Sequence, residues 1–162
     1  MKRPRKDDLE RWAELADRAL IIAREIQLRG YRDARALALT ASEGMVMRYM
    51  QEHPIAAPNQ VAAAVGLQRT NLSTLLRDLE AKGLIERSVS EGDRRGVTVR
   101  LTERGRRNYL VVRGEWAATV ARAVENDTRG LDGALVLLRQ ITDGLIATRP
   151  ARPGRDMSRA ED

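Results

Sequence analysis

One segment of this sequence carries side chains whose types and spacing suit contact with nucleic acid. Across residues 69–82, leucines recur at the spacing of one helix face. The opposite face combines short hydrogen-bonding side chains with a guanidinium, which suits base edges and phosphates better than the Glu/Lys mixture of a merely solvated face. An ordinary polar surface is the alternative, and this helix alone does not decide between them. The polar residues of that face are Thr70, Asn71, Thr74 and Arg77, with Ser73 beside them.

A second group of charged side chains lies in the loop that follows. Residues 84–107 contain seven arginines and four acidic residues, and Arg94 and Arg95 stand at the apex of the loop formed by residues 91–96. An arginine in that place can enter a minor groove, where the phosphates of both strands concentrate negative potential. Asp93 is placed to orient one of these guanidiniums through a bidentate pair. The alternative is an exposed turn of mixed charge.

The sequence before and within this region predicts the helices that would position these side chains. Residues 40–43 form a capping-box sequence, which begins a helix that ends before Pro54. A short helix begins at Pro58, which suits a first helical position. After a tight turn comes the helix of residues 69–82, with Gly83 as its stop. Two helices joined by a tight turn form a helix-turn-helix.

Beyond Gly83 the apolar period changes from that of a helix to that of a strand. Two alternating runs, residues 85–90 and 97–101, flank the polar loop and predict a β-hairpin. The order helix, short helix, turn, helix, hairpin is that of a winged helix-turn-helix. We therefore expect a mainly α fold with a small β-hairpin wing, in which the polar helix fits the major groove of DNA.

Long helices are predicted on both sides of this lobe, at residues 9–28 and 102–127 and from Leu131 onward. Apolar residues occupy most of their circumference, as Val136 and Ile146 do beside the main stripe of the last helix. Helices of this kind are buried on most sides, and a chain of this length has little else to cover them. We expect a second copy of the chain as the partner, with two recognition helices ~34 Å apart. Packing within one chain is the alternative.

These elements divide the expected chain into four parts. An N-terminal arm and dimerisation helix occupy residues 1–36, and the winged helix-turn-helix lobe occupies residues 37–107. Dimerisation helices follow at residues 108–148. A flexible C-terminal tail, residues 149–162, contains prolines and alternating charges.

Charge and composition narrow the class of protein. The net charge of +6 gives affinity for phosphate polymers or anionic surfaces, although it is weak evidence by itself. Without cysteine, disulfides and thiolate metal sites are excluded, and the one histidine, His53, stands at a helix end. No catalytic grouping or phosphate-binding loop is visible, so we expect no enzyme, cofactor or metal. No secretion signal or stretch of ~18 apolar residues is present, which predicts a cytoplasmic protein without membrane contact.

Longer stretches of the sequence resemble the MarR family of winged-helix transcription regulators. LRDLEAKGLIER (76–87) and DRRGVTVRLTERG (93–105) are similar to the end of its recognition helix and its wing. LTASEGMVMRYMQEHP (39–54) and QVAAAVGLQRTNLSTLL (60–76) are similar to the helix before its helix-turn-helix and to the motif itself. The resemblance covers about residues 37–107 and extends to the flanking helices in layout only.

The resemblance implies a homodimeric regulator, more often a repressor than an activator, on a roughly palindromic operator in double-stranded DNA. It also implies a small aromatic effector bound where the dimer helices meet the lobe. Trp12, Tyr31, Tyr49 and Tyr109 are candidates there, although their spacing also fits the core. Gln68 is a poor N-cap where the family usually has Ser or Thr, which puts the helix start in question. The implied DNA contacts are Arg69, Thr70, Asn71, Ser73, Thr74 and Arg77, with the wing arginine Arg95 and Arg94 beside it.

A winged-helix module that binds protein without DNA is the alternative function. Such a module would present an apolar outer face on helix 69–82. The sequence presents a polar one, which favours DNA.

Overall fold

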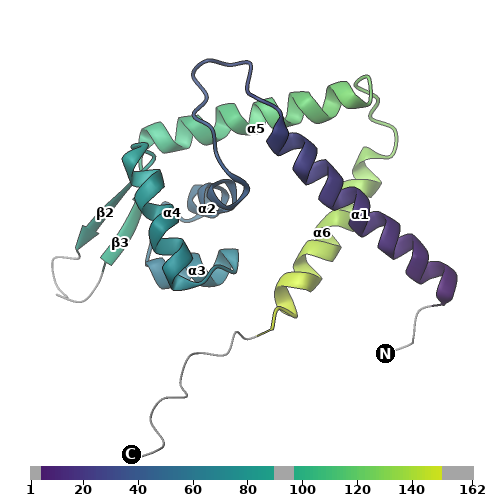
Figure 1. Ribbon diagram of the computed structural model, residues 1–162, viewed down its shortest axis with the longest axis horizontal. Coiled ribbons are helices and arrows are strands. Elements are labelled where there is room, and N and C mark those ends of the chain that lie inside the picture. The colour runs from purple at the N-terminus through teal and green to yellow at the C-terminus, as the bar shows by residue number, and fades with distance from the viewer. Residues whose placement is uncertain (1–4, 90–96, 151–162) are drawn as a thin grey trace, which may run out of the picture. The chain divides into compact units, whose positions relative to one another are not determined.

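The computed structural model describes residues 5–89 and 97–150 of the chain. The chain forms two compact units that divide after Ala123, and each is described by itself. The second unit contains α6 (Leu131–Ala147). A mainly helical fold with a small antiparallel sheet was predicted, and it is confirmed (Figure 1). The first unit contains α1 (Lys6–Leu28), α2 (Ala41–Glu52), β1 (Ile55–Ala56), α3 (Pro58–Val65), α4 (Arg69–Ala81), β2 (Ile85–Val89), β3 (Val97–Leu101) and α5 (Glu103–Ala123).

An apolar core joins α2, α4, the sheet and α5. The predicted leucine stripe of α4 lies in this core, because Leu72, Leu76 and Leu79 are buried and Leu75 is half-buried. Val46 and the other inward residues of α2 pack on it, together with side chains from β3 and α5. Burial of a leucine side chain contributes about 1.5–3 kcal/mol. The core therefore fixes α4 by one face and leaves the opposite face at the surface.

Local sequence signals begin and end the helices of the lobe. The predicted capping box of α2 is present: Thr40 Oγ1 accepts from Glu43 N at 3.2 Å, and Glu43 Oε2 accepts from Thr40 N at 2.8 Å. α3 begins at Pro58. Gly66 and Gly83 follow α3 and α4 with φ of 70° and 68°, in the left-handed region that glycine adopts without a Cβ clash. These signals act within a few residues, so they are readable from the sequence.

The sheet contains one strand that the sequence analysis did not predict. Its order is β1–β3–β2, and both pairs are antiparallel. β2 and β3 form the predicted hairpin, and the structure gives its register, with Ile85 opposite Leu101 and Ser88 opposite Thr98. The strand β1 has only two residues, after Pro54, so no alternation of apolar residues could reveal it. It joins the segment before α3 to the inner strand of the wing.

Two long helices differ at their ends from the expected boundaries. α1 begins at Lys6, so residues 6–8, which were expected to belong to a loose arm, are helical. Its first turn carries Asp7 and Asp8, which favour the positive end of the helix dipole. α5 ends at Ala123 rather than near residue 127, because Glu125 and Asn126 adopt φ of 53° and 60°.

The flanking helices bury far less than the lobe does. α1 buries none of its residues, and Leu20 and Leu28 are 71% and 60% exposed. In the second unit, α6 also buries no residue, and its exposed apolar side chains include Leu145 and Ile146. The described part of the chain contains no helix long and apolar enough to cross a membrane. Among the described residues, most apolar side chains of α1 and α6 are exposed, and only Leu15, Ile26, Leu137 and Ile141 are half-buried.

Candidate nucleic-acid interface

The outer face of α4 carries all six side chains that were predicted to contact DNA from this helix. Each is exposed, although the leucines on the opposite face are buried. Successive residues turn by about 100°, so Thr70, Thr74 and Arg77 lie at the centre of this face. Arg69 and Ser73 lie on the flank toward β2, and Asn71 lies on the flank toward α2. The structure thus brings the six residues onto one continuous surface.

The polar groups of this surface are largely free to bind a ligand. Ser73 is the exception, because its Oγ donates to the carbonyl of Arg69 at 2.9 Å. Across the described residues, the side chains of Arg69, Thr70, Asn71, Thr74 and Arg77 have neither a hydrogen bond nor an ion pair. A helix face that only keeps a protein in solution commonly carries paired charges, whereas this face keeps its donors and acceptors unpaired.

The start of α4 lacks a side-chain cap, as the poor N-cap residue Gln68 predicts. That residue precedes the helix in an extended conformation and makes no side-chain cap hydrogen bond. The first turn of α4 therefore keeps backbone N–H groups without a side-chain acceptor. The helix is held by its leucine stripe instead of by its N-cap.

A polar contact that the sequence analysis missed joins the end of α4 to the wing. Glu80 accepts from the backbone N of Arg87 at 3.1 Å and from its Nε at 2.8 Å, and it also binds Nη2. The Arg87 guanidinium beside it lowers the pKa of the Glu80 carboxyl, although desolvation acts in the opposite direction. The pair holds β2 against the flank of α4, so this strand and this helix keep one orientation.

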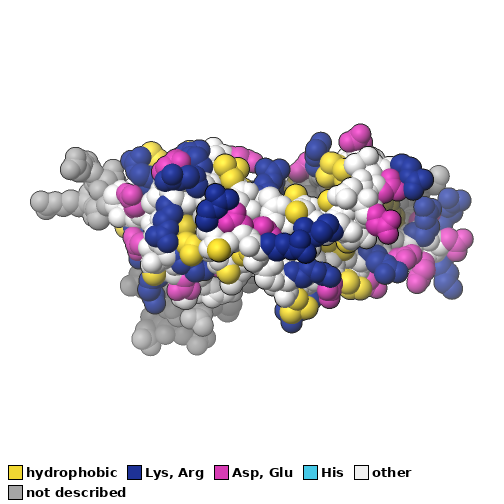
Figure 2. Space-filling view, turned by 90° about the horizontal axis from the view of Figure 1, so that it is seen from above, with side chains coloured by type: hydrophobic (Ala, Val, Ile, Leu, Met, Phe, Trp, Pro, Cys, Tyr) yellow, Lys and Arg dark blue, Asp and Glu magenta, His cyan; other side chains and the backbone are white. Residues whose placement is uncertain are grey.

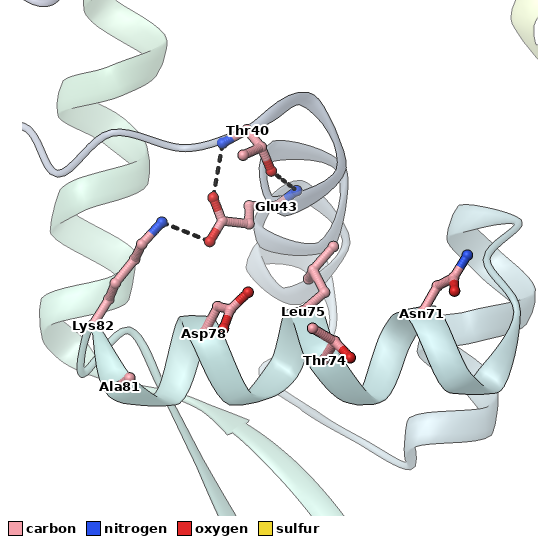
Figure 3. A pocket seen from close by; sticks show the side chains of 8 residues that line it. All are labelled: Thr40, Glu43, Asn71, Thr74, Leu75, Asp78, Ala81 and Lys82. Carbon is pink, nitrogen blue, oxygen red and sulfur yellow. Dashed lines mark hydrogen bonds and ion pairs between the residues drawn. The ribbon is translucent and has the colours of Figure 1, made fainter.

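An ion pair between half-buried Lys82 and buried Glu43 fixes the same end of α4 to α2. Lys82 Nζ donates to Glu43 Oε1 at 2.6 Å and to the carbonyl of Ala38 at 3.0 Å (Figure 3). Glu43 is only 3% exposed, and its other carboxylate oxygen belongs to the capping box of α2. An unpaired charge at such a site would cost several kcal/mol. The sequence showed Glu43 only as a capping residue, because its partner lies 39 positions away.

A groove of about 530 Å³ runs between α4 and the start of α2. Asp78 lines it one helical turn from Thr74 and two turns from Asn71 (Figure 3). Asp78 is exposed and has no ion-pair partner among the described residues. This carboxylate on the candidate DNA surface was not predicted. It can accept a hydrogen bond from a base amino group, and it repels phosphate.

The base of the wing is fixed to α5 by Thr102. Its Oγ1 lies 2.9 and 3.0 Å from the carbonyls of Gly83 and Leu84 and accepts from Gly105 N at 2.9 Å. A Cβ on Gly105 would lie 2.0 Å from the carbonyl oxygen of Leu84, so only glycine permits this approach. The predicted wing-apex residues, Asp93, Arg94 and Arg95, lie outside the described residues.

Of the aromatic residues considered for an effector pocket, the three tyrosines contribute to the core of the lobe. Tyr109 is buried in the core and Tyr31 packs against it. Tyr49 stacks on His53 with ring centroids 4.4 Å apart. Trp12 is 48% exposed on α1. Across the described ranges, no group of His, Asp and Glu side chains is placed to hold a metal ion.

Comparison with known proteins identifies the lobe. The model of the MarR family matches residues 39–96. The transcriptional repressor MprA of Escherichia coli strain K12 is 33% identical over 72 residues, which are 44% of this chain and 41% of that protein. The chain thus spans less than half the length of the curated relatives it matches.

Solved structures share the fold over most of the chain. A structure from Pseudomonas aeruginosa PA01 is 28% identical, has a TM-score of 0.66, and covers 86% of this chain and 99% of its own. BpsR of Bordetella bronchiseptica, whose DNA binding is regulated by 6-hydroxynicotinic acid, is 21% identical with a TM-score of 0.62. It covers 82% of this chain and 98% of its own. The family match lies on the winged lobe itself and the fold agrees, so the lobe is similar to that of MarR family proteins.

Proposed function

We propose that the chain is a transcription regulator that binds double-stranded DNA sequence-specifically as a homodimer, and that it acts as a repressor on a palindromic operator. The observation that carries the proposal is the division of α4 into two faces. Its leucines are buried, whereas five of its six candidate contact side chains have no partner among the described residues. Such a face suits the varied donors and acceptors of a major groove. The repressor description of MprA supports the sign of regulation.

In this proposal the hairpin extends the contact beyond the major groove. Arg94 and Arg95 at its apex reach the neighbouring minor groove or backbone, with Asp93 orienting a guanidinium. The support is the firm base of the hairpin, which Glu80–Arg87 and Thr102 fix to α4 and α5. A rigid base lets an apical side chain reach a fixed place on DNA.

The homodimer is supported by the uncovered apolar faces. α1 and α6 bury no residue although they carry leucine, isoleucine and valine side chains. Exposed apolar side chains that gather on one helix commonly mark an interaction site. We propose that residues 1–36 and 108–148 provide the dimer contacts and residues 37–107 the DNA contacts.

A response to a small aromatic effector is part of the proposal. The DNA binding of BpsR is regulated by 6-hydroxynicotinic acid, and that protein shares this fold. We propose no catalytic activity, and we place the action of the regulator in the cytoplasm.

Selection of bound duplexes from a random pool tests the proposal and reveals the operator. The expected result is an inverted repeat bound by a dimer, with an affinity that falls steeply as salt rises, with a slope of about −0.9 per phosphate contact. Failure to bind any duplex at low salt would favour the protein-binding module instead. An enriched motif without two-fold symmetry would contradict the dimer.

A further inference from the structure

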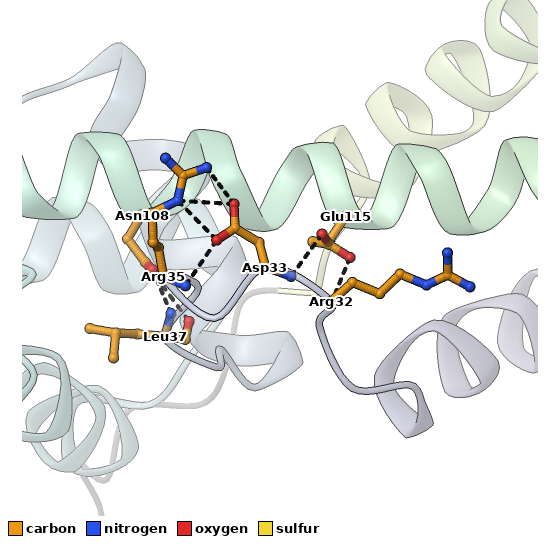
Figure 4. Close-up of polar contacts among 6 residues, drawn as sticks. All are labelled: Arg32, Asp33, Arg35, Leu37, Asn108 and Glu115. Atoms are coloured by element: carbon orange, nitrogen blue, oxygen red, sulfur yellow. Dashed lines mark hydrogen bonds and ion pairs between the residues drawn. The ribbon is translucent and has the colours of Figure 1, made fainter.

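The segment between α1 and α2, residues 29–39, forms no helix or strand and is called the connector below. Near its start, the Glu115 carboxylate of α5 accepts from the backbone N–H groups of Arg32 and Asp33, both at 3.2 Å (Figure 4). Each carboxylate oxygen takes one of the two donors. This side chain therefore fixes the direction in which the chain leaves α1.

Near its end, the connector is held by a side chain that both donates and accepts. Asn108 Oδ1 accepts from Leu37 N at 2.7 Å, and Asn108 Nδ2 donates to Leu37 O at 3.1 Å. Asn108 is 5% exposed. An amide carries a donor and an acceptor at one end, which an ionised carboxylate does not. Asn108 and Glu115 lie about two helical turns apart, so α5 holds the connector at two separate points.

Between these two points the connector forms a turn of its own. The Asp33 carboxylate accepts from the backbone N of Arg35 at 2.9 Å, and from its guanidinium through Nε at 2.9 Å and Nη2 at 2.6 Å. Ala36 N donates to the carbonyl of Asp33 at 3.0 Å. With its backbone groups paired in this way, the connector is a stiff link between the elements it joins.

The connector is also fixed to the recognition helix. Lys82, which follows α4, donates from Nζ to the carbonyl of Ala38 at 3.0 Å and to Glu43 Oε1 at 2.6 Å. Leu39 is 4% exposed and belongs to the core of the lobe. The last residues of the connector are therefore held by α4 as well as by α5.

α1 has little other attachment to the lobe. None of its residues is buried, and only two of its apolar side chains, Leu15 and Ile26, are half-buried. Packing of this extent holds a helix weakly, because its stabilisation is proportional to the apolar area that is buried. The direction of α1 relative to α4 therefore depends chiefly on the connector.

The surface around α5 gives these polar side chains no separate role in binding DNA. Figure 2 views the molecule from the side on which α5 lies in Figure 1, and shows arginine and lysine side chains interspersed with acidic and apolar ones. A surface of mixed charge attracts phosphates weakly. Asn108 is buried, and the Glu115 carboxylate would repel a phosphate. Both side chains thus serve the connector.

We propose that the connector sets the separation and orientation of the two recognition helices in the dimer, and hence the half-site spacing that the protein accepts, with Asn108 and Glu115 as positioning residues. The inference rests on the proposed function, in which α1 lies at the dimer interface and α4 on DNA. A change in the course of the connector moves each α4 relative to the two-fold axis. Spacing matters because each base pair inserted between half-sites rotates one of them by about 35°.

Distances between spin labels test the proposal without DNA. The chain contains no cysteine, so Thr70→Cys, on the exposed face of α4, gives one labelling site in each protomer. Double electron–electron resonance on the dimer should show one narrow distribution of distances. Asn108→Ala combined with Glu115→Ala should broaden it at least twofold, because the connector is then free of α5. Glu115→Gln keeps one acceptor oxygen and should broaden it less.

Operator spacing is the second readout, measured with the unlabelled chain. The duplexes carry the selected half-sites at their selected spacing or with two base pairs inserted. The insertion should weaken binding of the parent chain at least tenfold and binding of the double variant at most threefold. Affinity for a single half-site should be equal in both. A merely structural role for Asn108 and Glu115 would instead lower all these affinities together.

A matched control and a second variant make every outcome decisive. Arg113→Ala, an exposed residue of α5 between the two positioning residues, should change neither readout. If thermal melting shows that the double variant does not fold, Glu115→Ala alone decides, because Asn108 still holds Leu37. A distribution of unchanged width in a folded variant would overturn the proposal, as would an unchanged spacing preference.

Failure of the proposed function gives a different result. A parent chain without dipolar coupling between labels would contradict the homodimer, and the role of the connector with it. A parent chain that binds no duplex would contradict DNA binding. A parent chain that dimerises and binds its operator, with variants that behave identically, would contradict only the role of the connector.

Discussion

α4 of the winged lobe and α1 carry apolar residues at similar helical spacing, but those of α4 are buried and those of α1 are mostly exposed. In the lobe, Leu72, Leu76 and Leu79 of α4 meet α2, the sheet and α5 and are almost fully buried. In α1, Leu20 and Ile22 remain 71% and 53% exposed. The lobe closes its core within one chain, whereas no described residue of α1 is buried. Apolar periodicity therefore predicts that a helix will be covered but does not identify the covering surface.

The largest expected effect compares one leucine from each region. Leu79→Ala should lower the free energy of unfolding by about 3 kcal/mol, because it leaves a cavity in the closed core. Leu20→Ala should change it by less than about 0.5 kcal/mol at protein concentrations where the chain is monomeric. Urea unfolding followed by circular dichroism measures both. Equal losses would show that α1 is covered within one chain.

The second prediction concerns association. Leu20→Lys with Ile22→Lys should weaken self-association at least a hundredfold, because two charges would be buried in the interface. The far-ultraviolet spectrum should keep its helical form. Sedimentation equilibrium measures the dissociation constant, and Arg24→Ala on the same helix is a matched surface control. Dimers of undiminished affinity would remove α1 from the proposed interface.

DNA binding should depend on Arg77, which is exposed on α4, and not on Arg24, which is exposed on α1. Arg77→Ala should weaken operator binding about tenfold, since it removes one charged contact, and should leave stability within about 0.5 kcal/mol. Arg24→Ala should leave affinity unchanged. Fluorescence anisotropy with the selected operator measures both variants. An Arg77→Ala variant of full affinity would remove this side chain from the interface.

Asp78 lies on the same surface as Arg77, but its negative charge should weaken DNA binding. Asp78→Asn should raise affinity for random-sequence duplex about threefold at low salt, because it removes a negative charge near the phosphates. If Asp78 also accepts a hydrogen bond from a base amino group, duplexes selected by the variant should lose the base preference at one position of the operator. Competition between operator and random duplex separates these effects. Lower affinity for random duplex would contradict the predicted repulsion.

The smallest expected effect is a loss of stability at low pH in residues 29–39, the segment that joins α1 to the lobe. The guanidinium of Arg35 lowers the pKa of Asp33 from 3.8 to about 2. The folded pKa is depressed, so its stabilisation is present above about pH 4 and is lost as pH falls toward 2. NMR titration of Asp33 measures the shift, and Asp33→Asn should flatten this part of the pH profile of stability. A pKa near 3.8 would show that the pair does not hold in solution.

Much of the lobe was predictable because its signals are local. The capping box at Thr40 and Glu43, the leucine stripe of α4 and the hairpin all depend on neighbours a few residues away or on an alternation visible in the sequence. The strand β1 was missed because two residues show no period. The assignment of six α4 side chains to DNA stays a prediction, although their shared exposed surface supports it.

The amino-acid sequence by itself determined the order of helices and hairpin, the two faces of α4 and the resemblance to the MarR family. The tertiary structure alone decided the pairing of Lys82 with Glu43 and of Arg87 with Glu80. It also decided the hydrogen bonds that Asn108 and Glu115 make with residues 29–39. It also placed Asp78, which has no ion-pair partner in the described part of the chain, in the groove beside α2. The physical reason is distance along the chain: backbone periodicity repeats within a few residues, whereas a polar side chain meets a partner that only the folded core brings near.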